Sequence, residues 1–313
     1  MALAGVSPLS GNAAPTGSHA LVLVLRALGL GDLLTGVPAL RALRRARPRD
    51  RVVLATPAAL APLARLTGAV DAVLPQAGLQ SGPLRTDGPP ALAVNLHGRG
   101  PESTALLRAT GPQQLWAFGP GPQWRDGEHE VDRWCRLLDH YGVAADPAEL
   151  ALPRPDRPSP VPGAVVVHPG AAAGSRRWPV HRFAAVAAAL AADGHRVVVT
   201  GGPSERDLAA AVGAEVLAPD LLGLAALVAD AALLVCGDTG VAHLATAYRT
   251  PSVLLFGPVP PAEWGPRSGP HTVLWKRGRG DPHGTEPDPA LLAITVDEVL
   301  AAARRTVRAP AAS

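Results

Sequence analysis

The sequence predicts an α/β protein made of two doubly wound domains that face each other across a cleft. Short aliphatic runs, such as residues 21–25, have the length and composition of buried parallel strands. Longer segments with helical spacing follow these runs, and the alternation occurs in both halves of the 313-residue chain. The proline-rich residues 146–163 separate the halves and are typical of an extended, semi-stiff linker.

The first half, residues 19–157, is expected to form one parallel sheet covered by helices. A leader over residues 1–18, rich in small residues and proline, is expected to be disordered. Strands are predicted at 21–25, 52–54, 70–74 and 92–96, and helices up to about Arg45 and at 58–66, 102–108 and 129–141. Pro38 should kink or delay the first of these helices.

The second half, residues 158–313, repeats the alternation. Strands are predicted at 164–167, 196–200, 232–236 and 252–256, and helices at 182–193, 204–212, 222–230, 239–248 and 296–305. The last helix is a candidate to pack back on the first domain. Residues 277–289 are rich in glycine and proline and are expected to form a mobile loop.

Composition narrows the classes of function. The net charge is +3, but the arginines are scattered and not interleaved with aromatic residues, so no nucleic-acid partner is expected. Cys135 and Cys236 lack metal-binding or disulfide spacing. Residues 221–236, the most apolar stretch, are too few to cross a bilayer, and the start of the chain does not resemble a signal peptide. We expect a cytoplasmic protein, with loose attachment to the inner face of the plasma membrane as an option.

The first chemical motif, Arg26-Ala-Leu-Gly-Leu-Gly-Asp32, directly follows the opening strand. Ligands of doubly wound sheets bind beyond the carboxyl ends of the strands, and glycine lets the backbone approach them closely. The dinucleotide fingerprint requires a third glycine where Leu34 stands, so a dehydrogenase is disfavoured. Asp32 is placed to accept a proton from an acceptor hydroxyl; the competing interpretation is that it only caps the following helix.

The second motif joins a strand end at His168 to the loop Gly174-Ser-Arg-Arg-Trp-Pro179. Its adjacent cations, Arg176 and Arg177, precede a helix and suit a diphosphate, because guanidinium offers a planar fork of donors to phosphate oxygens. The competing interpretation is a solvated basic loop. His168 by itself is more typical of a structural loop histidine than of a ligand.

The third motif, Cys236-Gly-Asp-Thr-Gly-Val-Ala-His243, ends a strand in a tight turn onto a helix N-terminus. Exposed N–H groups and the helix dipole make such a turn an anion site. Thr239 and His243 share the helix face that looks toward this anion. Asp238 either caps the helix or holds a ribose hydroxyl, and Gly240 closes the turn.

Four further residues are weaker candidates for the site. Glu205 either accepts from a ribose or sugar hydroxyl or only favours the start of its helix. Gly31, His97 and Arg99 form the candidate acceptor side at strand ends of the first domain. The sequence contains no Asp-x-Asp pair and no His/Cys cluster, so neither a metal nor another cofactor is expected. Arginine and helix ends would then stabilise the leaving group.

Together these motifs resemble those of glycosyltransferase family 9, the ADP-heptose:lipopolysaccharide heptosyltransferases. The resemblance runs from about Ala20 to Arg267 and rests on LRALGLGDLLTGVPALRALR, HPGAAAGSRRWPVHRF, TGGPSERD and GDTGVAHLATAYRTPSVLLFGP. It implies a GT-B architecture of two Rossmann-like domains and inversion at the anomeric carbon.

The resemblance also assigns roles to individual residues. Asp32 matches the family's proposed catalytic carboxylate, Arg176 stands where a lysine usually contacts the donor phosphates, and Glu205 falls near a donor-contacting glutamate. The family's Asp-Thr-Gly-x-x-His turn is matched by Asp238, Thr239, Gly240 and His243. Residues 171–173 are alanines where relatives often have a threonine-rich loop, so the identity of the donor sugar stays open.

The sequence thus predicts a monomeric, metal-independent, inverting glycosyltransferase that uses an ADP-heptose-like donor. The expected acceptor is a hydroxyl of a cell-envelope glycan or of a lipid-linked molecule. One alternative is a nucleotide-sugar epimerase of the same fold, which would turn over without an acceptor. Another is a non-catalytic protein that binds sugar nucleotides and releases no nucleotide.

Overall fold

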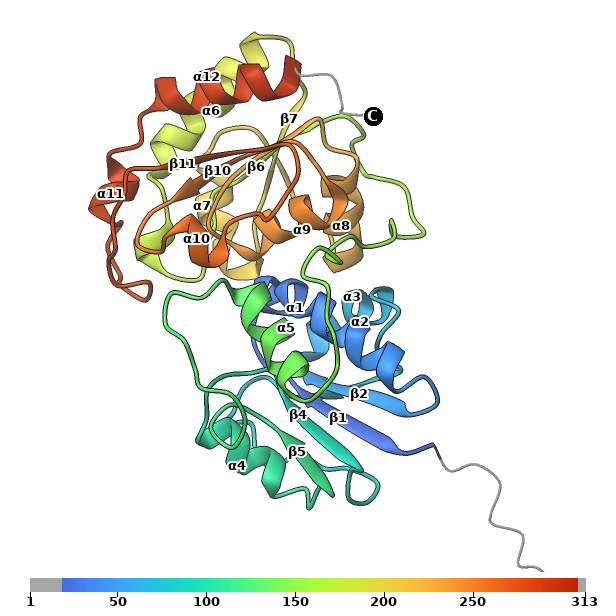
Figure 1. Ribbon diagram of the computed structural model, residues 1–313. Coiled ribbons are helices and arrows are strands. Elements are labelled where there is room, and N and C mark those ends of the chain that lie inside the picture. The colour runs from blue at the N-terminus through green and yellow to red at the C-terminus, as the bar shows by residue number, and fades with distance from the viewer. Residues whose placement is uncertain (1–18, 309–313) are drawn as a thin grey trace, which may run out of the picture.

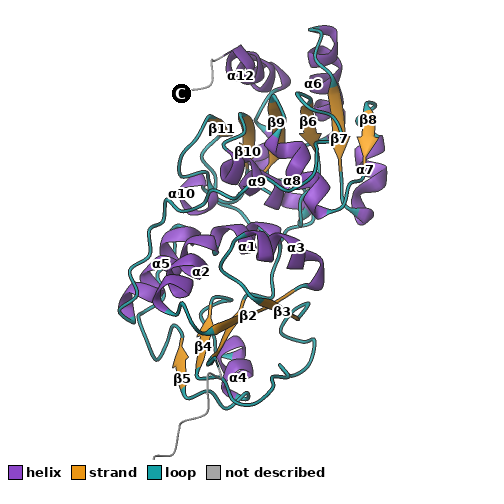
Figure 2. Cartoon of the chain, turned by 90° about the vertical axis from the view of Figure 1, so that its right-hand side faces the viewer, coloured by secondary structure: helices purple, strands orange, loops and turns teal. Residues whose placement is uncertain are grey.

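The computed structural model describes residues 19–308 and shows two α/β lobes stacked one on the other (Figure 1). The leader expected over residues 1–18 lies outside the described residues. Each lobe contains one parallel sheet with helices packed against it, which confirms the predicted fold class (Figure 2).

The first lobe holds a five-stranded sheet in the order β3-β2-β1-β4-β5. Its strands are β1 (Leu21–Leu25), β2 (Arg51–Thr56), β3 (Ala72–Pro75), β4 (Leu92–Asn95) and β5 (Gln114–Trp116). Its helices are α1 (Leu30–Thr35), α2 (Val37–Ala46), α3 (Ala61–Leu66), α4 (Glu102–Arg108) and α5 (Glu130–His140). The strand order reverses beside β1, so the loop after β1 lies where doubly wound sheets bind their ligands.

The second lobe holds a six-stranded sheet in the order β11-β10-β9-β6-β7-β8. Its strands are β6 (Val165–His168), β7 (Val197–Thr200), β8 (Glu215–Leu217), β9 (Leu233–Gly237), β10 (Ser252–Phe256) and β11 (His271–Trp275). Its helices are α6 (Val180–Ala192), α7 (Arg206–Ala210), α8 (Leu221–Ala229), α9 (Gly240–Tyr248), α10 (Pro261–Trp264), α11 (Pro289–Leu292) and α12 (Val296–Arg308). Here the order reverses between β6 and β9, whose following loops carry the second and third motifs.

The helix expected to run to about Arg45 is divided at Gly36. This glycine ends α1 and begins α2, and Pro38 stands in the first turn of α2, where its missing N–H does no harm. A Cβ at Gly36 would lie 3.0 Å from the side chain of Arg26. The predicted interruption is present, and room for a buried arginine is part of its cause.

The sequence did not predict β5, β8, β11, α10 and α11. All three are edge strands of their sheets, and β8 and β11 are only partly buried. A strand that is paired on one side and partly solvated does not need a continuous apolar run. The two helices have four residues each, too few for a periodic pattern.

The proline-rich connector is bonded to both lobes. The guanidinium of Arg41, in α2, donates to the carbonyl oxygen of Glu149 over 2.8 Å. Three residues later, the amide of Leu152 donates to the carbonyl oxygen of Ala247, in α9, over 3.2 Å. The connector therefore follows the surface of both lobes.

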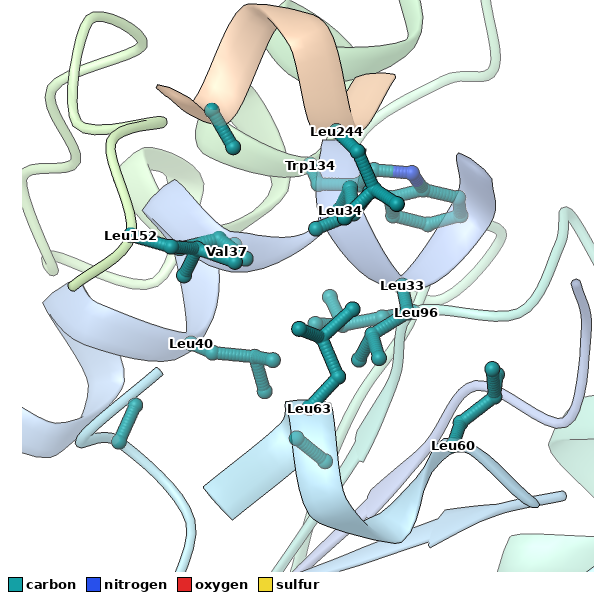
Figure 3. Close-up of a cluster of buried hydrophobic side chains, with 14 of the residues drawn as sticks. Leu33, Leu34, Val37, Leu40, Leu60, Leu63, Leu96, Trp134, Leu152 and Leu244 are labelled. Carbon is teal, nitrogen blue, oxygen red and sulfur yellow. The ribbon is translucent and has the colours of Figure 1, made fainter. Parts of the chain in front are cut away.

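One apolar cluster continues from the first lobe into the second (Figure 3). Leu34 and Val37, in the α1–α2 region, belong to the same cluster as Leu152 of the connector and Leu244 of α9. Their exposed fractions are 7% or less. Full burial of such a side chain contributes about 1.5–3 kcal/mol, so apolar packing joins the lobes in this conformation.

The final helix, α12, packs on α6 and on strands of its own sheet, at the end of the second lobe that is far from the first (Figure 1). The expectation that it returns to the first domain is wrong. Its buried face contains Val299, Ala302 and Ala303, which join the second lobe's own core. Within residues 19–308, no helix combines the length and apolarity needed to cross a bilayer.

His271 gives a prediction about stability. The residue begins β11, and its Nδ1 lies 2.7 Å from the hydroxyl of Ser252. Burial lowers the pKa of His271 to about 4. Because this is below the ordinary value near 6.5, the unfolded chain takes up the proton first as the pH falls. The stability contributed by neutral His271 is therefore complete above pH 6.5 and is lost as the pH falls toward 4.

We expect the free energy of unfolding to fall by about 2 kcal/mol between pH 7 and pH 4.5 because of His271. Thermal unfolding at a series of pH values measures the change, and His271→Gln should reduce its slope. His181→Gln, at an exposed position of α6, is the matched control. Identical slopes in His271→Gln and in the unsubstituted chain would contradict the prediction.

Candidate active site between the lobes

The glycine turns of the first and third motifs meet at the lobe boundary. A Cβ added at Gly31 would lie 2.9 Å from Cδ2 of His243 and 3.4 Å from Cα of Gly240. A Cβ added at Gly240 would lie 2.8 Å from Cβ of Leu30. Only glycine permits this approach, so the two turns, more than two hundred residues apart, form one site.

Asp32 stands in the first turn of α1 and its side chain is 24% exposed. Its Oδ2 accepts a hydrogen bond from the amide of Gly29 over 3.1 Å, so the capping interpretation holds. Burial raises the pKa of Asp32, the charge of Arg26 lowers it, and the charge of Glu130 raises it. The cap uses only one carboxylate oxygen, so it does not compete with a role as proton acceptor.

Arg26 is a functional candidate that was not among the site residues predicted from the sequence. Its side chain is fully buried at the end of β1, and its Nη2 lies 3.9 Å from Oδ1 of Asp32. The only sequence signal was a charge placed directly after an apolar strand, a position that buried charges occupy only when they have partners.

Arg176 and Asp238 form an ion pair on the second lobe. The Nη1 of Arg176 lies 3.4 Å from Oδ2 of Asp238, and their side chains are 23% and 6% exposed. Burial raises the pKa of Asp238, Arg176 lowers it, and the charge of Asp32 raises it. This last effect agrees with the close approach of Gly31 to Gly240, which brings the turns of Asp32 and Asp238 together at the lobe boundary.

Thr239 occupies the N-cap position of α9, and its side chain makes no capping hydrogen bond there. The first N–H groups of a helix lack intrahelical partners and favour an anion. Gly240 begins α9, so these groups, the Thr239 hydroxyl and the Arg176 guanidinium belong to neighbouring parts of the second lobe. The arrangement has the donors that a diphosphate requires.

The turn that carries Arg176 is held by residues of the segment expected to be a mobile loop. The amide of Ser175 donates to the carbonyl oxygen of Gly284 over 2.9 Å, and the amide of Asp288 donates to that of Ser175 over 3.1 Å. A Cβ at Gly174 would lie 1.7 Å from the carbonyl oxygen of Thr285. Residues 277–289 are therefore packed on the second motif instead of extending freely.

A cavity of about 190 Å³ lies at the carboxyl ends of β6 and β7. His168 lines the cavity, and its Nδ1 lies 3.0 Å from the hydroxyl of Thr200. An oxygen of Glu205 accepts from the amide of Gly202 over 2.8 Å and lies 3.9 Å from Nε2 of His168. Glu205 thus caps the start of its helix and lies next to His168, a residue of the cavity wall.

His243 is enclosed between the lobes. Its ring packs edge-on against Trp264 with centroids 6.0 Å apart, and Gly31 lies on another side. Burial lowers the pKa of His243 to about 4, so its imidazole is neutral at neutral pH. A neutral imidazole has one N–H donor and one acceptor nitrogen, so His243 can still donate a hydrogen bond to a diphosphate oxygen.

The two remaining acceptor-side candidates, His97 and Arg99, have different environments in the structure. The Nδ1 of His97 accepts from the amide of Ala27 over 3.2 Å, so His97 supports the loop after β1. Burial lowers the pKa of His97, and the charge of Arg26 lowers it further. Arg99 is exposed at the surface. Among residues 19–308, no group of three or more His, Cys, Asp or Glu side chains is placed to hold a metal ion.

Gly31→Ala should impair the site by forcing the lobes apart. The new methyl group would overlap the His243 ring unless one lobe moves, so we expect kcat/KM for the proposed transfer to fall roughly tenfold or more. Affinity for ADP should fall as well, because the clash involves His243 and Gly240 of the donor-side turn. Gly98→Ala, where a Cβ would meet no atom within 4 Å, is the control. Full activity in Gly31→Ala would show that this close contact is not needed.

These two lobes, each built on a parallel sheet whose strand order reverses, have the GT-B fold of glycosyltransferases. Residues 123–289, more than half of the chain, match the family described as glycosyltransferase family 9 (heptosyltransferase). The chain belongs to that family.

Individual relatives agree with this assignment. The chain is 34% identical to lipopolysaccharide heptosyltransferase 3 of Escherichia coli over 157 residues, which are 46% of this chain and 40% of that protein. The aligned part therefore spans less than half of this curated relative.

Solved structures with the same fold include the family 9 glycosyltransferase of Veillonella parvula DSM 2008 and heptosyltransferase II of E. coli. The first has 20% identity, a TM-score of 0.74 and coverage of 92% of this chain and 97% of that one. The second has 20% identity, a TM-score of 0.72 and coverage of 91% and 98%.

Proposed function

We propose that this chain is an inverting, metal-independent glycosyltransferase that moves a heptose or related sugar from an ADP-heptose-like donor to an acceptor hydroxyl. One observation carries the proposal: a Cβ at Gly31, next to Asp32, would lie 3.4 Å from Cα of Gly240, two residues after Asp238, which pairs with Arg176. The proposed proton acceptor and the proposed diphosphate site therefore lie at the same boundary between the lobes. Family membership supports the reaction class.

In the proposed reaction, Asp32 takes the proton of the acceptor hydroxyl as the oxygen attacks the anomeric carbon. The bond from this oxygen to the carbon forms while the bond from the carbon to the diphosphate oxygen breaks on the opposite face, which inverts the configuration. The raised pKa of Asp32 makes it a stronger base than an ordinary aspartate. Proton transfer of this kind contributes about 10²–10⁴-fold to a rate.

The departing diphosphate gains negative charge, which the second lobe is built to stabilise. Arg176 supplies a fixed positive charge, and the start of α9 at Gly240 supplies N–H donors beside the Thr239 hydroxyl. We assign the cavity beside His168 and Glu205 to the nucleoside, because it opens at the carboxyl ends of strands in the same lobe. E. coli heptosyltransferase WaaC, which shares the fold with a TM-score of 0.70, has been solved with ADP.

Metal independence is part of the proposal, because positive charge at the diphosphate comes from Arg176 and the helix end. A more distant structural relative, TibC of E. coli, is described as iron-containing, with 16% identity and a TM-score of 0.66. Removal of metal ions by a chelator distinguishes metal-independent from metal-dependent transfer by this chain. Dialysis against EDTA should leave the rate of transfer unchanged, whereas a loss restored by iron would refute metal independence.

We assign the acceptor to the cell-envelope glycans or their lipid-linked precursors. A cytoplasmic monomer with peripheral attachment to the inner membrane face is the arrangement that suits such an acceptor and a nucleotide-sugar donor. Size-exclusion chromatography with light scattering tests the oligomeric state. Flotation with phosphatidylglycerol vesicles tests the attachment.

The function is tested first by ligand binding and then by turnover. A ligand that binds the folded state raises Tm, so ADP and ADP-heptose should stabilise the protein more than UDP, GDP or their sugar derivatives. ADP release from ADP-heptose is then followed with and without a panel of envelope glycans. We expect release to depend on an added acceptor.

Each alternative gives a different result in the same assays. An epimerase would change the sugar without an acceptor and release no ADP. A non-catalytic binding protein would show the rise in Tm with no change in the donor. A protein that is stabilised by none of the nucleotides would contradict the proposed function altogether.

A further inference from the structure

The buried guanidinium of Arg26 has polar and aromatic partners on several sides. Its side chain is 0% exposed, and an uncompensated charge in such a position is costly. Its Nη2 donates to the Thr35 hydroxyl over 3.0 Å and to Oε1 of Glu130 over 3.1 Å. Its Cζ lies 4.8 Å from the centroid of the Trp134 ring. The arginine is therefore fixed by partners on several sides.

Two further contacts reach the backbone. The guanidinium donates to the carbonyl oxygen of Asp32 and to that of Leu96, at the end of β4. The Thr35 hydroxyl also donates to the Asp32 carbonyl, over 3.1 Å. With six residues, α1 is too short to be stable by itself, so these bonds fix the turn that carries Asp32. One side chain thus joins β1, α1, β4 and α5.

The same network continues to the second lobe through the start of α5. Glu130 follows His129, whose Nε2 lies 3.0 Å from the carbonyl oxygen of Gly265 in the second lobe. Two residues further along α5, Asp132 pairs with Arg267 of the second lobe. The partner of Arg26 therefore lies in the turn of α5 that touches the opposite lobe.

We propose that Arg26 is a positioning residue for the transfer reaction: it orients the Asp32 carboxylate toward the second lobe and, through Glu130, couples this orientation to the contact between the lobes. The proposal rests on the proposed function. Arg26 does not touch the reacting atoms, because it is enclosed by protein. It acts through Asp32.

The charges around Asp32 make the proposal measurable. Arg26 and Glu130 act on the Asp32 carboxyl in opposite directions, the first lowering its pKa and the second raising it. The charge of Asp32 in turn raises the pKa of Asp238, in the second lobe. Nearby histidines on which the charge of Arg26 acts are His97 and His243. Loss of either charged partner should therefore shift the titration of Asp32, and the two shifts should have opposite signs.

The experiment uses Arg26→Met, Arg26→Lys and Glu130→Gln in the full chain. With ADP-heptose and the acceptor, the acid limb of the kcat–pH profile should move to higher pH by about one unit in Arg26→Met. In Glu130→Gln it should move to lower pH. The kcat on the plateau should fall roughly tenfold to a hundredfold in Arg26→Met, with partial rescue in Arg26→Lys. Affinity for ADP should stay within about twofold.

Arg133→Met is the matched control. Arg133 is buried in the same aromatic cluster, pairs with Glu130 over 2.7 Å and stacks on Trp124 with its Cζ 4.1 Å from the ring centroid. Its other hydrogen bonds go to the carbonyl oxygens of Arg125 and Glu128, outside α1, so its loss should lower Tm with little change in plateau kcat. Should Arg26→Met behave like Arg133→Met, with lower Tm and normal kcat, Arg26 would be a stability residue only.

A titration without substrate separates this proposal from the proposed function. The ¹³C shift of the Asp32 carboxyl carbon, assigned with Asp32→Asn, reports its protonation directly. Opposite shifts in Arg26→Met and Glu130→Gln support the positioning role even where the unsubstituted chain transfers no sugar, a result that would refute the proposed function alone. An unchanged titration in both variants overturns the role of Arg26. If Arg26→Met fails to fold, Arg26→Lys and Glu130→Gln carry the test.

Discussion

Asp32→Asn is expected to lower kcat for sugar transfer by about 10³-fold while leaving the Kd for ADP within about twofold. Asparagine keeps the shape of the side chain, and its amide oxygen can still accept the hydrogen bond from Gly29. The helix start is therefore preserved and only the proton acceptor is lost. ADP release measures the rate, and isothermal titration calorimetry measures the affinity.

The control for this prediction is Asp50→Asn. Asp50 belongs to the same lobe and lies 3.8 Å from the guanidinium of Arg47, away from the interlobe site. We expect its kcat to equal that of the unsubstituted chain. Near-normal turnover in Asp32→Asn would leave Asp32 with the capping role alone and would require another base.

Arg176→Ala is expected to weaken ADP binding by roughly tenfold to a hundredfold. A hydrogen bond to a charged group contributes about 1.5–3 kcal/mol, and each 1.4 kcal/mol is a factor of ten. The substitution also leaves the buried carboxylate of Asp238 without its cation, and an unpaired carboxylate repels a diphosphate. Calorimetric titration with ADP measures the loss.

Two further variants test whether the loss is specific to Arg176 and whether its charge alone is sufficient. Arg177→Ala removes the neighbouring arginine, whose Nε donates to the carbonyl oxygen of Ala171 over 2.9 Å, and should keep most of the ADP affinity. Arg176→Lys should lie between the two, because it retains the charge but not the planar fork. If Arg176→Ala binds ADP as tightly as the unsubstituted chain, the diphosphate does not lie at this turn.

The sequence left the role of Asp32 open between proton acceptor and helix cap, and the structure shows why both interpretations arose. The carboxylate caps α1 through one oxygen and remains partly exposed at the lobe boundary. Glu205 is a similar case, because it caps its helix and lies 3.9 Å from His168, which lines a cavity. A helix that starts at the carboxyl end of a strand needs a capping side chain and also borders the place where ligands bind. Local sequence therefore cannot distinguish a capping role from a binding role.

Other features were outside the reach of local sequence. The contacts of Arg26 with Leu96 and Glu130 join residues 70 and 104 positions apart. The packing of the 277–289 segment on the turn at Ser175 depends on backbone groups, which every residue possesses. A glycine- and proline-rich composition indicated a mobile loop, but backbone hydrogen bonds to a distant turn hold this segment in place.

The sequence by itself determined the two parallel sheets, the order of their main elements and the positions of the glycine turns, because aliphatic runs, helical spacing and glycine are local properties. Only the tertiary structure decided which charges meet. It brought the turn of Asp32 against the turn that follows Asp238, buried Arg26 against Glu130, and kept α12 on its own lobe. Electrostatic effects depend on distance and burial, and both are set by how distant segments of the chain pack together.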